Sequence, residues 1–213
     1  MNKHSSATTI ARILISARDA FAEHGFDGAR LDAIAKDAGV TKQLVYHYFK
    51  TKEELYGVVL DRVAEEMRVL LEDPDYEILP PSEALRRFAE RVHNALAERP
   101  YMVAMTLDQG LHRGVHVSRR SQYIPTVKQF VANSIQPILE RGADQGVFRA
   151  NVDPFLFYWT AFSILSAVFM QRWDMSSTTE IAFDGDAGIG LWNAHSIDFI
   201  LHALRPETSA LLR

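Results

Sequence analysis

Apolar residues recur at three- and four-residue spacings along most of the chain, a pattern typical of amphipathic α-helices. The first clear stripe runs from Ile10 to Phe21 and predicts a helix over about residues 8–24, with Gly25 as its stop. Few stretches alternate with a period of two, which is the pattern of half-buried strands. The sequence therefore predicts an all-α protein.

Two short helical patterns follow, over about residues 31–38 and 41–48, with Gly39 between them. Thr41 stands where a helix N-cap is expected. Two helices joined by so tight a turn are typical of a helix-turn-helix, whose second helix enters the major groove of DNA. An ordinary helical hairpin has the same local pattern, so the interpretation depends on the surrounding chain.

The second helix of this pair would expose four side chains that can contact DNA: Lys42, Gln43, Tyr46 and His47. Lysine suits the acceptor atoms of guanine, and glutamine suits adenine. Tyr46 and Tyr48 can hydrogen-bond phosphates or contact thymine methyl groups. Lys52, at the start of the next helix, can meet the phosphate backbone.

The longest uncharged run, Phe155–Met170, lies in a predicted helix near the C-terminus. It is shorter than the roughly 20 residues that cross a membrane, and we expect no membrane insertion. A helix that is apolar on most faces is usually buried on most faces. We therefore expect a partner subunit on one face, with Phe162 and Ser166 turned toward it.

Charge is distributed unevenly along the 213 residues, whose formal net charge is −4. Taken alone, this value argues against a nucleic-acid partner, which usually accompanies a basic excess. Residues 1–52, however, hold eight Lys or Arg and five Asp or Glu, a net charge of +3, and the remainder carries −7. The basic segment coincides with the predicted helix-turn-helix and supports DNA binding.

The sequence contains no cysteine, which excludes thiol catalysis, disulfides and cysteine-based zinc sites and is compatible with the cytoplasm. It also lacks a Gly-rich phosphate loop and the G-x-S-x-G and H-E-x-x-H motifs. We therefore expect no enzyme activity, no catalytic residue and no cofactor. His112 and His116 have metal-compatible spacing, but no third ligand is evident, and we expect no metal site.

One non-catalytic alternative is a helical module that binds protein through the same exposed helix. DNA binding would weaken steeply as salt rises, because Lys and Arg contacts with phosphate release counterions. A salt-insensitive partner would favour the protein-binding module.

Residues 10–60 resemble the N-terminal domain of the TetR/AcrR family of transcriptional regulators, most specifically in IAKDAGVTK and LVYHYFKTKEEL. The resemblance implies a repressor, or less often an activator, that binds a palindromic operator as a homodimer. It implies a three-helix helix-turn-helix DNA-binding domain at residues 1–55 and a helical effector-binding and dimerisation domain at 56–213. Helices over about 154–173 and 189–204 would pair with their twofold mates.

The resemblance carries DNA contacts over to eight positions of this chain: Arg30, Thr41, Lys42, Gln43, Tyr46, His47, Tyr48 and Lys52. The chain departs from the family pattern at Ala29–Arg30, where members often have a capping Thr or Ser that touches phosphate. It departs again at Gln43, where many members have Gly or a small residue. We interpret Gln43 as a reader of bases.

The effector is not implied by the resemblance, because the C-terminal domains of the family diverge. Composition suggests a ligand pocket lined by Met105, Gln109, His112, Tyr123, Trp159 and Phe162. An apolar cavity with a few polar groups suits a small lipophilic or aromatic effector. Aromatic and Met stripes are more often plain core, so Gln109 and His112 are the preferred candidates for orienting a ligand. Effector binding would shift the population toward a wider separation of the two DNA-reading heads.

Overall fold

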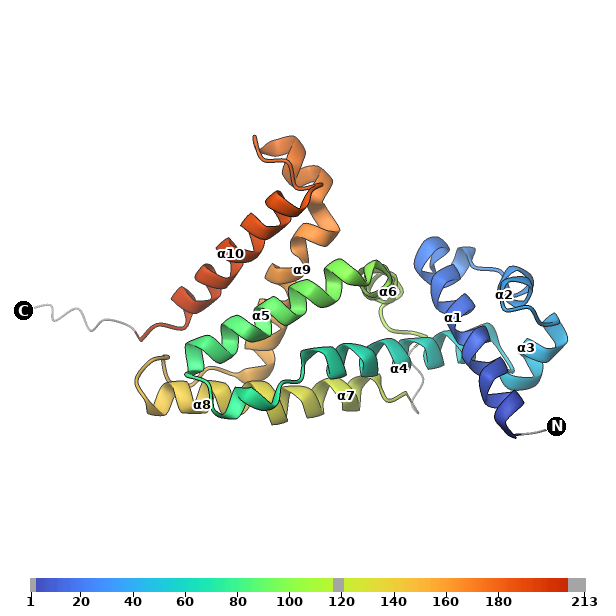
Figure 1. Ribbon diagram of the computed structural model, residues 1–213, viewed down its shortest axis with the longest axis horizontal. Helices are drawn as coiled ribbons and strands as arrows, with labels where there is room; N and C mark the ends of the chain where they lie inside the picture. The colour runs from blue at the N-terminus through green and yellow to red at the C-terminus, as the bar shows by residue number, and fades with distance from the viewer. Residues whose placement is uncertain (1–2, 117–120, 207–213) are drawn as a thin grey trace, which may run out of the picture. The chain divides into compact units, whose positions relative to one another are not determined.

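The computed structural model describes residues 3–116 and 121–206, with side chains described from residue 6 onward. Every regular element in these ranges is a helix, and none is a strand (Figure 1). The all-α prediction is therefore confirmed.

Two compact units share the chain. The first unit comprises Met1–Glu66 and Arg99–Thr126, and the second unit comprises Met67–Glu98 and Val127–Arg213. Because both units are made of discontinuous segments, a sequence cut at one position does not separate them.

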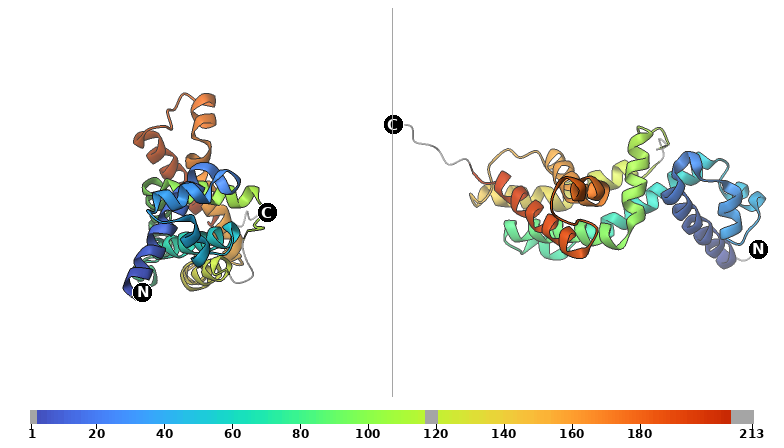
Figure 2. Two further views of the ribbon diagram at one scale, coloured as in Figure 1. Left: turned by 90° about the vertical axis from the view of Figure 1, so that its right-hand side faces the viewer. Right: turned by 90° about the horizontal axis from the view of Figure 1, so that it is seen from above.

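Among the described residues of the first unit, six helices lie wholly or partly in it: α1 (Lys3–Gly28), α2 (Leu31–Asp37), α3 (Lys42–Tyr48), α4 (Lys52–Leu71), α6 (Pro100–Leu111) and α7 (Tyr123–Phe130). The N-terminal three form one cluster, which Figure 2 shows from two further sides. Helix α1 begins earlier than the apolar stripe predicted. The chain leaves the helical conformation at Gly25, with φ 68° and ψ 175°, where the stop was predicted.

A single apolar core holds the first unit together. Ile13 and Phe21 of α1, Ile34 of α2 and Val45 of α3 are completely buried in it, and so is Tyr56 of α4. The rings of Phe21 and Tyr56 meet edge to face, with centroids 4.9 Å apart. Burial of the predicted stripe on α1 explains why α2 and α3 have a fixed platform.

The second unit continues α4 and α7 and adds further helical elements: η1 (Pro74–Glu77), α5 (Pro81–Glu98), the π-helical turn η2 (Val131–Ile135), α8 (Gln136–Asp144), α9 (Pro154–Thr178) and α10 (Asp186–Ala203). Helix α5 packs against α8, α9 and α10. Phe88 of α5 contacts the rings of Phe130 and Tyr158. These aromatic contacts place α5 at the centre of the unit.

Helix α9 extends five residues beyond the predicted end near Trp173. Ser177 and Thr178 donate hydrogen bonds to the carbonyl oxygens of Trp173 and Asp174, so polar side chains are accommodated in the last turn. Within the described ranges, α9 is the one helix whose length and apolar composition would suffice to cross a membrane. It packs instead against α5 and α10.

The face of α9 that points inward differs from the prediction. Phe162 and Ser166 are 7% and 1% exposed, buried within the second unit, so the prediction that they face a partner is wrong. The exposed face carries Leu156, Trp159 and Ser163. Because α9 is apolar all round, sequence periodicity could not distinguish its two faces.

Candidate DNA-binding interface

The turn between α2 and α3 is built by local interactions. Gly39 has a φ of +64°, a left-handed conformation that side chains disfavour. The Oγ1 of Thr41 accepts a hydrogen bond from the backbone N–H of Leu44 at 3.2 Å, which caps α3. Ile34 and Val45 are fully buried between the helices. The predicted helix-turn-helix geometry is confirmed.

Helix α3 presents an exposed row of hydrogen-bonding groups: Lys42, Gln43, Tyr46 and His47. Lys42 and Gln43 occupy its first turn, and Tyr46 is 43% exposed. In a helix-turn-helix, side chains near the N-terminus of the second helix reach base edges. The row therefore has the location and the chemistry for reading DNA.

A carboxylate lies beside two of the predicted DNA contacts. Asp32 Oδ2 is 2.9 Å from the guanidinium nitrogen Nη2 of Arg30, and Asp32 Oδ1 is 3.4 Å from Nζ of Lys42. Hydrogen bonds from its own backbone N–H and from Arg30 and Lys42 lower the pKa of Asp32. Arg30 itself occupies the N-cap of α2 without a capping side-chain bond. Asp32 thus holds both cations in the free protein.

Tyr48 and Lys52 have partners within the first unit. The Tyr48 hydroxyl is 3.0 Å from the hydroxyl of Ser6, and the ring packs against the core. Lys52 Nζ donates to the carbonyl oxygen of Asp27 at 3.2 Å and lies 4.8 Å from the ring centroid of Phe26. These contacts restrain both side chains near the start of α4.

Two basic side chains near the helix-turn-helix, Arg12 and Lys50, were not among the predicted DNA contacts. Arg12 is exposed on α1, and its guanidinium reaches within 3.5 Å of the position that a Cβ at Gly39 would take. Lys50 is exposed just after α3, where its Nζ donates to the carbonyl oxygen of His47 at 3.1 Å. Lys50 could have been predicted from sequence, because it follows α3 directly. Arg12 could not, because only folding brings it near the turn at Gly39.

Elsewhere in the first unit, Asp108 connects α6 to α1 and α4. Its Oδ1 accepts the backbone N–H of Phe26 at 3.0 Å, and its Oδ2 accepts the Tyr56 hydroxyl at 2.5 Å. Burial, followed by this hydrogen bond and the charge of Asp108, raises the pKa of Tyr56. A Cβ at Gly25 would lie only 2.8 Å from Asp108 Oδ1, so the kink in α1 makes room for the carboxylate.

The six residues predicted to line an effector pocket are divided between the two units. Met105 is buried in the core of the first unit, 1% exposed. The His112 ring contacts the Asp108 carbonyl oxygen at 2.8 Å and an Asp27 carboxylate oxygen at 3.3 Å. Gln109 and Tyr123 are also in the first unit, where burial raises the pKa of Tyr123 and the Gln109 side chain partly offsets this rise.

Trp159 and Phe162 belong to the second unit, where their rings meet edge to face. Trp159 is 43% exposed, and Phe162 is buried. Phe162 therefore contributes to the core of the second unit, whereas Trp159 lies at its surface.

Comparison with known proteins assigns the chain to a family. A model of the bacterial regulatory proteins of the tetR family matches residues 13–59, and a model of the tetracyclin repressor-like C-terminal domain matches residues 81–200. The chain belongs to the TetR family. This TetR-family protein is accordingly a helix-turn-helix DNA-binding transcriptional regulator and not an enzyme.

Curated relatives of this TetR-family chain are regulators. It is 27% identical over 140 residues to the HTH-type transcriptional repressor NicS of Pseudomonas putida, covering 66% of each chain. It is 30% identical over 120 residues to the repressor SCO4008 of Streptomyces coelicolor, covering 54% of this chain and 58% of the relative. The chain thus spans somewhat less than two thirds of the length of both relatives.

Solved structures share the fold over nearly the whole chain. SCO4942 from Streptomyces coelicolor superposes with a TM-score of 0.70 at 22% identity, covering 92% of this chain and 98% of that one. The TetR-family regulator PfmR from Thermus thermophilus superposes with a TM-score of 0.67 at 28% identity, covering 91% and 96%. The helices that follow the helix-turn-helix therefore belong to the same fold as those of its structural relatives.

Proposed function

We propose that this protein is a repressor that binds a palindromic operator as a homodimer and is released by a small lipophilic or aromatic effector. The observation that carries the proposal is the exposed row of Lys42, Gln43 and Tyr46 on the capped helix α3. Two of its curated relatives are named as transcriptional repressors. Because the proposed partner is operator DNA, the proposed location is the cytoplasm.

Each predicted contact has a distinct role in the proposed complex. Lys42 reads guanine and Gln43 reads adenine in the major groove, with Tyr46 and His47 beside them. Arg30, Thr41, Tyr48 and Lys52 contact phosphates, which position the helix without specifying sequence. To contact DNA, Arg30 and Lys42 must give up their ion pairs with Asp32. The loss of these pairs limits how much each cation adds to the affinity for DNA.

The homodimer is proposed to form through α9 and α10. Both helices expose large apolar side chains: Leu156, Trp159, Leu191 and Phe199 are between 43% and 71% exposed. Contiguous apolar surface on a soluble protein marks an interaction site. A homodimer would supply two copies of α3, one for each half-site of a palindromic operator.

The proposed division of labour assigns residues 1–55 to DNA binding and residues 56–213 to effector binding and dimerisation. Gln109 and His112 remain the proposed polar points of the effector site, and Met105 and Tyr123 of the same unit remain its proposed apolar side chains. Effector binding would favour a state whose α3 helices do not match the operator spacing.

Selection of bound duplexes from a random pool tests the DNA-binding part of the proposal. We expect related half-sites in inverted repeat, with affinity that falls steeply as salt rises. Lys42→Ala and Gln43→Ala should lower the affinity for the selected operator more than the affinity for unrelated DNA. Lys36→Ala, at an exposed position of α2, is the matched control. Selected duplexes without a shared sequence, or binding that does not depend on salt, would contradict the proposal.

Light scattering after size-exclusion chromatography tests the dimer. Leu156→Glu and Leu191→Glu should each lower the measured mass toward that of a monomer. Ile78→Glu places the same charge at a 79% exposed position outside α9 and α10 and should leave the mass unchanged. A dimer that persists in both test variants would refute this interface.

A further inference from the structure

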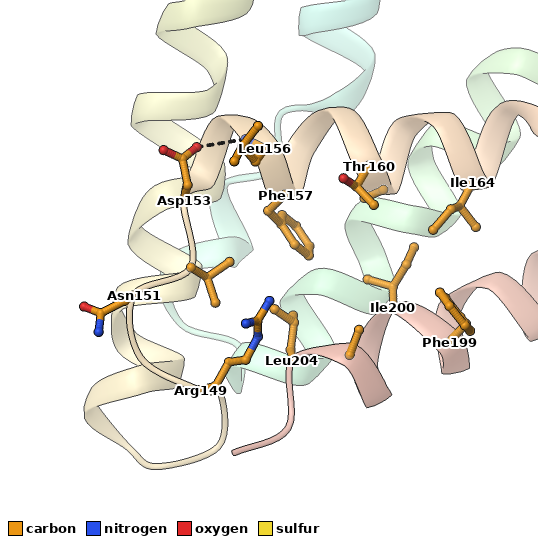
Figure 3. A pocket seen from close by; sticks show the side chains of 13 residues that line it. Arg149, Asn151, Asp153, Leu156, Phe157, Thr160, Ile164, Phe199, Ile200 and Leu204 are labelled. Carbon is orange, nitrogen blue, oxygen red and sulfur yellow. Dashed lines mark hydrogen bonds between the residues drawn. The ribbon is translucent and has the colours of Figure 1, made fainter. Parts of the chain in front are cut away.

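The cavity of about 290 Å³ between α9 and α10 belongs to the face that the proposed dimer covers, because Leu156 and Phe199 line it (Figure 3). A second copy of the chain would therefore close it to free ligands. A cluster of titratable groups from α1, α4 and the end of α6 lies outside α9 and α10, entirely within the first unit. His112 is the central member of this cluster.

Both ring nitrogens of His112 face oxygen atoms that can only accept hydrogen bonds. Nδ1 is 2.8 Å from the carbonyl oxygen of Asp108, and Nε2 is 3.3 Å from the carboxylate oxygen Oδ2 of Asp27. A neutral imidazole carries hydrogen on one nitrogen alone, whereas the imidazolium donates from both. The geometry is therefore that of the protonated ring, and the neutral ring would have to give up one of the two contacts.

The position of His112 in the helix also favours a cation. His112 is the C-cap residue of α6, where the negative end of the helix dipole stabilises positive charge. Hydrogen bonds to the Asp108 carbonyl oxygen and to Asp27 raise the pKa of His112. The cation consequently persists above the usual value of about 6.5 and is lost as pH rises further.

The charged and titratable groups around the His112 ring come from three helices and the turn that follows α6. They are Asp27 of α1, Lys52, Glu53 and Tyr56 of α4, Asp108 of α6, and His116 in the turn. The ring centroids of His112 and His116 are 5.0 Å apart, so a proton on His116 would oppose one on His112. Three carboxylates face these two imidazoles, which favours protonation of His112.

Asp27 connects His112 to a predicted DNA contact. Its carbonyl oxygen accepts a hydrogen bond from Lys52 Nζ at 3.2 Å, while its carboxylate is 87% exposed. An exposed negative charge beside Lys52 would repel a phosphate that approaches this lysine, and the positive charge of His112 compensates it. An effector that accepts the hydrogen bond from Nε2 would displace Asp27 from the same atom, so the two proposed roles of His112 use one contact.

We propose that the ion pair of His112 and Asp27 is a proton-operated switch of DNA affinity. With His112 protonated, the charge of Asp27 is compensated, and Lys52 can meet a phosphate without repulsion. With His112 neutral, Asp27 repels the phosphate, and the affinity for DNA falls. The switch rests on the proposed phosphate contact of Lys52. Because DNA binds the protonated form more tightly, DNA in turn favours protonation of His112.

Fluorescence anisotropy with a labelled duplex of arbitrary sequence, near pH 6 and near pH 8.5 at one ionic strength, tests the switch. No operator is needed, because phosphate contacts do not depend on sequence. Near pH 6, His112→Gln should bind about two- to fivefold more weakly than the natural protein, the range for an exposed ion pair. Near pH 8.5 the two proteins should bind equally, because His112 has then lost its proton. A residue that only maintained the fold would weaken binding at both pH values.

Two further variants assign the effect to the pair. Asp27→Asn removes the charge that His112 compensates, so His112→Gln should have no additional effect on affinity in that background. His24→Gln removes another exposed histidine of the first unit, which lies 3.9 Å from Glu23 and not beside Asp27. This control should retain the pH dependence of the natural protein.

Histidine titration by NMR without DNA tests the ion pair separately. Asp27→Asn should lower the titration midpoint of His112, and addition of the duplex to the natural protein should raise it. An unchanged midpoint in Asp27→Asn would refute the pair, and equal effects of His112→Gln at both pH values would refute the switch. Lys52→Gln distinguishes the two proposals, because unaltered DNA affinity in that variant would contradict the proposed phosphate contact itself.

Discussion

The Tyr56 hydroxyl donates a hydrogen bond to Asp108, a carboxylate of α6 that also accepts the backbone N–H of Phe26. Tyr56→Phe would leave one buried carboxylate oxygen without its donor. We expect this change to lower the free energy of unfolding by about 1–3 kcal/mol, as measured by urea denaturation. Tyr46→Phe removes an exposed hydroxyl from the same unit and should have little effect. Equal stability of the two variants would contradict a stabilising role for Asp108.

Gly25 carries the kink that admits the same carboxylate. Gly25→Ala combines an unfavourable backbone conformation with a close approach to Asp108, and should destabilise the protein by about 1–3 kcal/mol. Gly110, on α6, has open space around its Cβ position. Gly110→Ala should therefore stabilise the helix by about 0.5–1 kcal/mol. Thermal unfolding of the two variants should shift in opposite directions.

In the proposed complex, Asp32 competes with DNA for Arg30 and Lys42. Asp32→Asn should raise affinity for an unrelated duplex several-fold at low salt, with the gain shrinking as salt rises. Asp37→Asn removes the same charge from the same helix at another exposed position. Fluorescence anisotropy with a labelled duplex compares the two variants. A similar gain in affinity from both variants would show that only the removed charge matters, and not the ion pairs of Asp32.

Thr41 closes the first turn of α3. Thr41→Ala should cost about 0.5–2 kcal/mol of stability and weaken operator binding, because α3 then begins without a side-chain acceptor. Thr41→Ser keeps the hydroxyl and should retain both properties. Denaturation and operator titration in parallel would measure the two effects. Normal binding by the alanine variant would separate the cap from DNA recognition.

His112 links the stability of the first unit to pH. The Asp108 carbonyl oxygen, the Asp27 carboxylate and the charge of Asp108 raise the pKa of His112. Stabilisation is complete below the unfolded-state value of about 6.5 and is lost as pH rises through the higher folded-state value. The difference in melting temperature between the natural protein and His112→Gln should thus be larger near pH 5.5 than near pH 8.5. A difference that does not vary with pH would contradict this link.

The helix-turn-helix could be predicted because its signals are local. Gly39 supplies the turn, Thr41 supplies the cap, and the buried positions Ile34 and Val45 lie close together in sequence. Asp108 had no such signal: its partners Phe26 and Tyr56 are 82 and 52 residues away along the chain. A carboxylate in an apolar stretch becomes recognisable as a connector only when folding brings its donors together.

Sequence periodicity predicted that α9 exists but not how it is oriented. Its apolar residues surround the helix, so Phe162 could equally have faced a partner or the core. The cavity between α9 and α10 could not be predicted from sequence either, because its walls come from two helices and a loop that meet only in the folded protein. The first turn of α1 was missed because its polar residues add nothing to the apolar stripe.

The ion pairs of Asp32 also bear on how quickly an operator can be found. A cation that must leave a carboxylate before it meets a phosphate forms a shorter-lived contact with random DNA. Each non-specific encounter then ends sooner, and the protein samples more positions in the same time. Base contacts by α3 would prolong the encounter only at the matching sequence, so one exposed carboxylate would favour rapid scanning over tight random attachment.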